Sequence, residues 1–136
     1  LVRSMQPLLL AYSLPGIILK ILFGKANRPS KTYEQLVSKY KSRLGEGGRA
    51  SGRFVPKPIK YENRELLLRR YMKMEKRFAN KIANITEEKL GRYILPHPLL
   101  GKLTLREMLF FTIYHNEHHL GILKRREESI SQDFLG

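Results

Sequence analysis

Cysteine is absent from this sequence of 136 residues. The chain therefore has no disulfide, no cysteine-ligated zinc or iron–sulfur site, and no thiol nucleophile of its own. Long apolar runs are absent as well. Residues 8–23 form the longest one, but it spans only 16 residues and is interrupted by Pro15, Gly16 and Lys20, whereas a membrane span needs about 20. We therefore expect no membrane span, no signal peptide, a cytoplasmic location, and a buried helix that is broken at Pro15.

Acidic side chains are scarce in the first half of the chain. Residues 1–85 contain 19 Lys and Arg against 5 Glu, which accounts for the whole formal net charge of +14, whereas residues 86–136 contain 7 of each sign. This asymmetry favours an anionic partner for the first half, whether nucleic acid, lipid head groups or an acidic small molecule. An ordinary solubilising surface explains the same charge, and both interpretations stay open.

Apolar residues at helical spacing account for most of the chain. The spacing predicts helices over residues 32–44 and 62–85, and Thr86 is placed to cap a short helix after them. Residues 45–61, with four glycines and two prolines, and residues 93–103, with two prolines and one glycine, are predicted to be loops. No strand pattern and no internal repeat is visible. The sequence therefore predicts an all-α bundle.

The last predicted helix carries two histidines on its core-facing side. It begins with a capping box, Thr104-Leu-Arg-Glu107, in which the two side chains satisfy backbone donors reciprocally. The core-facing stripe then runs through Leu105, Met108, Thr112, His115, His119 and Ile122. His115 and His119 lie one turn apart on one face, which allows both imidazoles to reach one cation. A pair of buried, hydrogen-bonded core histidines is the alternative.

Three nearby side chains are assigned other roles. His118 leaves the stripe and is expected on the flank or surface of the helix, and His97 is expected to make a structural contact in its loop. Glu117 is about 200° around the helix from His115, because successive residues are 100° apart. It cannot act as the base of a metalloprotease HExxH motif.

Residues 97–125, HPLLGKLTLREMLFFTIYHNEHHLGILKR, resemble the C-terminal signature of the DinB/YfiT-like superfamily. The GGRASGRFVP loop is similar to that of a subgroup of the same superfamily. The resemblance implies an all-α, up-down four-helix bundle, here a single domain over residues 1–136. It also implies a divalent metal ion (Zn, Ni or Fe) on three histidines, with the paired ligands at His115 and His119. Residues 1–85 contain no histidine, so we expect the third, with the N-terminal part of the first helix, upstream of Leu1.

Three functions follow from the resemblance and the charge. The first is that of a bacterial metal-dependent enzyme, either hydrolase-like or a transferase that uses an anionic low-molecular-weight thiol such as bacillithiol. Arg49 and Arg53, in the long loop, are the candidate contacts for that anionic cosubstrate. The second is a non-catalytic or degenerate bundle. Nucleic-acid binding is the least favoured, because no recognised DNA-binding motif is present. A homodimer is common in such families.

Overall fold

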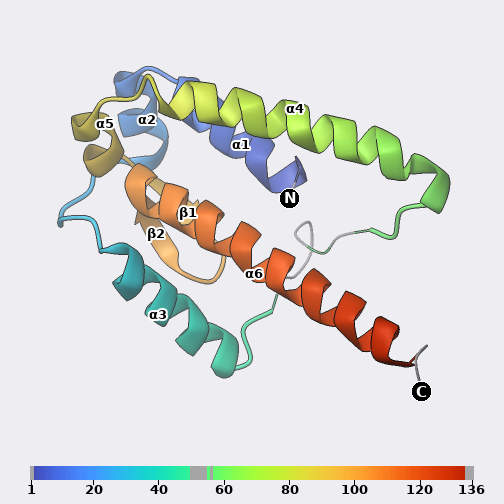
Figure 1. Cartoon of the computed structure of the whole chain (residues 1–136). Helices are drawn as coiled ribbons and strands as arrows, with labels where there is room; N and C mark the ends of the chain where they lie inside the picture. The colour runs from blue at the N-terminus through green and yellow to red at the C-terminus, as the bar shows by residue number, and fades with distance from the viewer. Residues whose placement is uncertain (1, 50–54, 56, 134–136) are drawn as a thin grey trace.

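The computed structural model describes residues 2–49, 55 and 57–133. This part of the chain folds into six α-helices, one short 3-10 helix and one two-stranded sheet (Figure 1). The elements are α1 (Val2–Ser13), α2 (Gly16–Phe23), α3 (Tyr33–Gly45), η2 (Tyr61–Asn63), α4 (Arg64–Ile82), α5 (Glu87–Arg92), β1 (Ile94–His97), β2 (Gly101–Thr104) and α6 (Leu105–Asp133). The predicted all-α class is confirmed.

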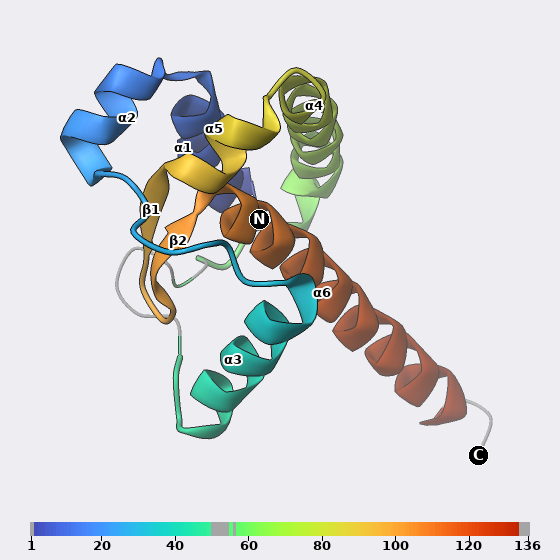
Figure 2. The ribbon, with the colours of Figure 1, turned by 90° about the vertical axis from the view of Figure 1, so that its left-hand side faces the viewer.

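Helix α6 lies at the centre of the arrangement. α1 packs along α4, and α3 packs along α6. Figure 2 shows α6 between the α1–α4 pair and α3. The shared core is formed by Leu8, Ala11, Tyr12, Leu19, Leu36, Tyr40, Met74, Phe78, Leu90, Leu95, Leu100, Leu103, Leu105 and Met108. The first turns of α6 are thus held in the core, whereas the residues from Leu123 to Gln132 are exposed.

The predicted helix boundaries agree closely with the observed ones. α3 begins after Thr32, whose hydroxyl accepts from the backbone N–H of Gln35 while the Gln35 side chain accepts from the backbone N–H of Thr32. This reciprocal pair is a capping box. Thr86 caps α5, as predicted, by accepting from the backbone N–H of Lys89 at 3.3 Å. α4 turns Met74 and Phe78 into the core, whereas Leu67, on the same apolar stripe of the helix, is exposed.

The prediction for residues 8–23 was half right. The helix breaks where Pro15 removes a backbone donor, so α1 ends at Ser13 and α2 begins at Gly16. α2, however, is not buried. Leu19 is its one buried residue, and Ile21 is 75% exposed. No helix in the described ranges combines the length and the apolar character that crossing a membrane requires.

The prediction of a loop over residues 93–103 was wrong. β1 and β2 pair antiparallel across these residues, with Leu95 opposite Leu103. Both leucines are buried in the core, and this burial, with the backbone pairing, stabilises strands too short to show an alternating pattern. Pro96 is tolerated because a two-stranded sheet has only edge strands. Gly101 supplies a positive φ of 76° at the start of β2.

The capping box at the start of α6 is confirmed and has a further partner. The backbone N–H of Thr104 donates to Glu107 Oε2 at 2.9 Å, and the backbone N–H of Glu107 donates to Thr104 Oγ1 at 3.1 Å. Arg28 also donates from both of its Nη atoms to the Glu107 carboxylate, at 2.6 and 2.9 Å. The chain between α2 and α3 is thereby fixed to the beginning of α6, which sets the direction of that helix.

Candidate functional site

The two stripe histidines meet on one face of α6. The Nε2 atoms of His115 and His119 lie 3.1 Å apart. Their ring centroids are separated by 4.5 Å, with the ring planes at 80°. The one-turn spacing therefore directs the same nitrogen of each ring to one point. This is the juxtaposition that the sequence pattern predicted.

Both imidazoles are biased toward the neutral form. Burial lowers the pKa of His115 to about 4, with the neighbouring His119 adding to the effect. Burial also lowers the pKa of His119, as does the nearby His118. Near pH 7 the two rings are therefore neutral, and each carries a nitrogen lone pair. A neutral imidazole is the form that binds a metal ion.

Aromatic residues from three elements hold the His115 ring in place. Phe111, one turn earlier on α6, stacks on it with centroids 5.1 Å apart. Tyr40 of α3 packs edge-on against Phe111 at 5.1 Å, and His97 of β1 does so at 4.3 Å. The sequence analysis missed this support. Phe111 at the i−4 position from His115 was the available signal, but its partners on α3 and β1 are distant in sequence.

The remaining histidines lie beside the pair without joining it. His97 is committed to its turn, because its Nδ1 accepts from the backbone N–H groups of Leu99 and Leu100 at 3.2 and 3.1 Å. This is the structural contact expected for it. His118 stacks on Tyr114 with centroids 5.9 Å apart, on the flank of α6.

Glu117 is directed away from the histidine pair, as its helical position predicted. Its Oε2 accepts from the hydroxyl of Tyr33 on α3 at 2.8 Å. A carboxylate that is bound to α3 in this way is not available to a ligand held between His115 and His119. The HExxH type of mechanism is therefore excluded by geometry as well as by spacing.

The donor pair fits a divalent ion, but it is incomplete by itself. Two nitrogens about 2.1 Å from one ion are separated by roughly 3.0 to 3.4 Å across right-angled to tetrahedral arrangements. The observed 3.1 Å between the Nε2 atoms falls in that range. His115 Nδ1 is buried and has no hydrogen-bond partner within the described part of the chain. No group of three or more His, Asp or Glu side chains suited to a metal occurs among residues 2–49, 55 and 57–133.

The structure describes one of the two residues predicted to contact an anion. Arg53 lies outside the described residues. Arg49 is exposed, and its Nη1 donates to the backbone carbonyls of Leu44 and Gly48 at 3.1 and 2.8 Å. These bonds hold Arg49 against the end of α3 and leave its other two guanidinium nitrogens, Nε and Nη2, without a hydrogen-bond partner among the described residues. The structure does not bring Arg49 into contact with the histidine pair.

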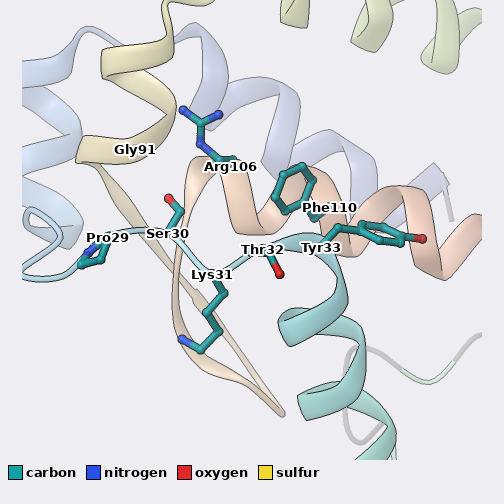
Figure 3. Close-up of a pocket in the computed structure, with 8 residues that line it drawn as sticks. All are labelled: Pro29, Ser30, Lys31, Thr32, Tyr33, Gly91, Arg106 and Phe110. Carbon is teal, nitrogen blue, oxygen red and sulfur yellow. The ribbon is translucent and has the colours of Figure 1, made fainter.

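An open pocket of about 520 Å³ lies elsewhere, between the α2–α3 connection, α5 and the start of α6. Its lining residues are Pro29, Ser30, Lys31, Thr32, Tyr33, Gly91, Arg106 and Phe110 (Figure 3). Arg106 is paired with Glu87, and Lys31 Nζ lies 3.5 Å from Glu107. In Figure 3 the Lys31 side chain points away from Arg106. The two cations therefore do not converge on a ligand, and neither histidine of the pair lines this pocket.

Comparison with protein families gives one finding. The model of the DinB superfamily matches residues 14–123, which include both histidines of the pair and the hairpin that supports them. Comparisons with curated proteins and with solved structures give no match.

Proposed function

The chain belongs to the DinB superfamily, and we propose that His115 and His119 are two ligands of a divalent metal ion. The observation that carries the proposal is the convergence of two Nε2 atoms at 3.1 Å. Such closeness is costly for two cationic rings. It is favourable for neutral rings, either as a hydrogen bond in which one Nε2–H donates to the other or when both Nε2 lone pairs face one ion. The pKa of each ring is lowered, so both are in the neutral form. Imidazole ligands suit Zn, Ni and Fe.

The remaining coordination positions belong to water, to a cosubstrate and to the predicted third histidine. Both views place the N-terminal end of α1 beside α6 (Figures 1 and 2). A ligand from a segment that precedes α1 would therefore approach α6, the helix that carries His115. This geometry supports the three-histidine set that the resemblance implies.

The reaction class we propose is transfer involving a low-molecular-weight thiol such as bacillithiol. When bound, the ion would supply Lewis acidity that lowers the pKa of the thiol and favours the thiolate. The thiol must come from a cosubstrate, because the chain contains no cysteine. Within the chain, Phe111 fixes the plane of His115. Arg49, which does not contact the pair, is the proposed contact for the acidic group of the cosubstrate.

Metal binding is tested with three alanine variants of the same helix. We would strip wild-type protein and the variants His115→Ala, His119→Ala and His118→Ala with a chelator. Each would then be titrated calorimetrically with Zn²⁺ or Ni²⁺. We expect His115→Ala and His119→Ala each to weaken binding by at least about tenfold, since each removes one of few ligands. His118→Ala is the matched control and should bind as the wild type does. Equal losses in all three variants would refute the assignment of the pair.

Activity is tested separately from metal binding. Metal-loaded protein would be incubated with bacillithiol and an electrophilic acceptor, and consumption of the thiol would be followed. Turnover that is lost in His119→Ala supports the transferase. Tight metal binding without turnover across a range of acceptors favours the second candidate, a non-catalytic metal-binding bundle. That candidate is favoured by the surroundings of the His115 ring, which packs against the aromatic rings of Phe111 and Tyr40.

A further inference from the structure

Helix α2 presents an apolar surface to solvent. Its sequence, GIILKILF, contains one buried residue, Leu19. Ile17 is 62% exposed, Ile21 75% and Leu22 59%. Neighbouring exposed isoleucine and leucine side chains on one short helix form a patch that typically marks an interaction surface. We call Ile17, Ile21 and Leu22 the α2 patch.

The surroundings of the α2 patch are cationic. Residues 1–33 contain no aspartate or glutamate. Lys20 lies within α2 and Lys25 follows it, and both are exposed. The exposed carboxylates of the neighbouring α5, Glu87 and Glu88, are paired with Arg106 and Arg92. An apolar patch with lysines at its margin is complementary to the surface of an anionic membrane, which has an apolar interior beneath negatively charged head groups.

Helix α4 adds a second cationic surface, along the upper side of the molecule in Figure 1. Five exposed residues, Arg69, Arg70, Lys73, Lys76 and Arg77, fall within an arc of about 120° when successive residues are placed 100° apart. Of these five, only Arg69 forms an ion pair among the described residues, with the exposed Glu65 at 3.2 Å. We call this set the α4 basic face. Figures 1 and 2 share their vertical axis, and both show α2 and α4 at the top of the molecule.

We propose that this end of the protein binds the surface of an anionic membrane, with the α2 patch entering the head-group region and the α4 basic face attracting acidic lipids. Apolar insertion and basic residues act together in peripheral membrane binding. A second copy of the chain is a poorer occupant of the patch. In a two-fold contact the same surface meets itself, so Lys20 and Lys25, the exposed charges of this segment, would approach their own copies. Nucleic acid is poorer as well, because it offers nothing to the exposed isoleucines.

The test is vesicle co-sedimentation with two lipid compositions. Vesicles of phosphatidylcholine alone would be compared with equimolar phosphatidylcholine and phosphatidylglycerol. We expect binding only to the anionic vesicles, weakening as salt is raised. Ile21→Ser should reduce vesicle affinity by about tenfold, because it removes most of one inserted side chain. Ile130→Ser is the matched control: Ile130 is 57% exposed on α6, and its replacement should change nothing.

A charge variant completes the design. Replacing Arg70, Lys73 and Arg77 together with Gln should weaken binding to the anionic vesicles without affecting the folded state, which circular dichroism would check. Three results would overturn the proposal. The first is that the protein does not bind anionic vesicles. The second is that wild type and Ile21→Ser bind them equally well. The third is that light scattering detects a stable dimer, which Ile21→Ser dissociates. Duplex DNA binding in place of vesicle binding would likewise assign the α4 basic face to nucleic acid.

Discussion

Replacing Glu107 with glutamine should strongly destabilise the fold, because this carboxylate connects three segments at the start of α6. The side chain has no exposed surface. It accepts from both Nη atoms of Arg28 and from the backbone N–H groups of Lys31 and Thr104, over distances of 2.6 to 2.9 Å. In Glu107→Gln the shape is kept, but the charge is lost and an NH₂ group replaces one accepting oxygen. The glutamine NH₂ group then faces other N–H donors in the protein interior, where water cannot replace the lost hydrogen bonds.

The pKa of Glu107 gives the size of the effect. Burial alone would raise it, but the hydrogen bonds from Arg28, Lys31 and Thr104 outweigh burial and lower the pKa from 4.5 to about 2. A pKa lowered by that amount corresponds to about 3 kcal/mol of folding free energy. Because the folded-state pKa is the lower one, this contribution is fully present above about pH 5. It is lost as the pH falls toward 2, where the carboxylate is protonated in the folded state as well.

The assay is urea unfolding of wild-type protein and Glu107→Gln between pH 7 and pH 2. At pH 7 the variant should be less stable by about 3 kcal/mol, and the difference should shrink as the pH falls below 5. Glu65→Gln is the control: Glu65 pairs with Arg69 in an exposed ion pair, and its loss should cost less than about 1 kcal/mol. A Glu107→Gln protein within about 0.5 kcal/mol of the wild type at pH 7 would refute the argument.

Two further changes test other contacts. Arg49→Ala should raise the KM for an anionic thiol cosubstrate, measured by steady-state kinetics. The unfolding midpoint should stay unchanged, because an exposed arginine away from special sites contributes within about ±0.5 kcal/mol to stability. An unaltered KM would show that Arg49 has no role in binding the cosubstrate. Tyr12→Phe should lower the free energy of unfolding by about 1 kcal/mol in urea titrations, because the buried Tyr12 hydroxyl donates to the Leu105 carbonyl at 2.7 Å. An unchanged free energy of unfolding would show that this hydrogen bond does not stabilise the fold.

Periodicity and capping chemistry identified the helices, because those signals are local. The helical periodicity of α4 and the caps at Thr86 and Thr104 depend on residues three or four positions apart. The helix and both caps are observed within a few residues of the predicted positions. The hairpin was missed because its strands are held together by tertiary burial. Leu95 and Leu103 are eight positions apart, and only the core that receives them distinguishes a strand from a loop.

The exposure of α2 was mispredicted for a related physical reason. An apolar run predicts burial only when enough other surface is available to cover it. Leu19 is covered by the core, but Ile17 and Ile21 have no covering element among the described residues. The ion pair between Arg28 and Glu107 could not be predicted from the sequence either, because 79 positions separate the two residues.

The histidine pair combines a predictable part with an unpredictable one. The i, i+4 spacing was sufficient to place two imidazoles on one face. What the spacing could not show is that burial on α6 falls off along the pair, from the half-buried His115 to the exposed His119. Structural zinc sites are closed by four protein ligands, whereas catalytic sites keep a position open to water or substrate. An ion held between a half-buried and an exposed histidine has solvent on one side. Moreover, Leu105, Met108 and Thr112, the buried stripe residues of α6, all precede His115, so the core of the described residues does not include the histidine pair. For the ion proposed at this pair, both features favour an exchangeable, substrate-accessible site over one that the fold requires.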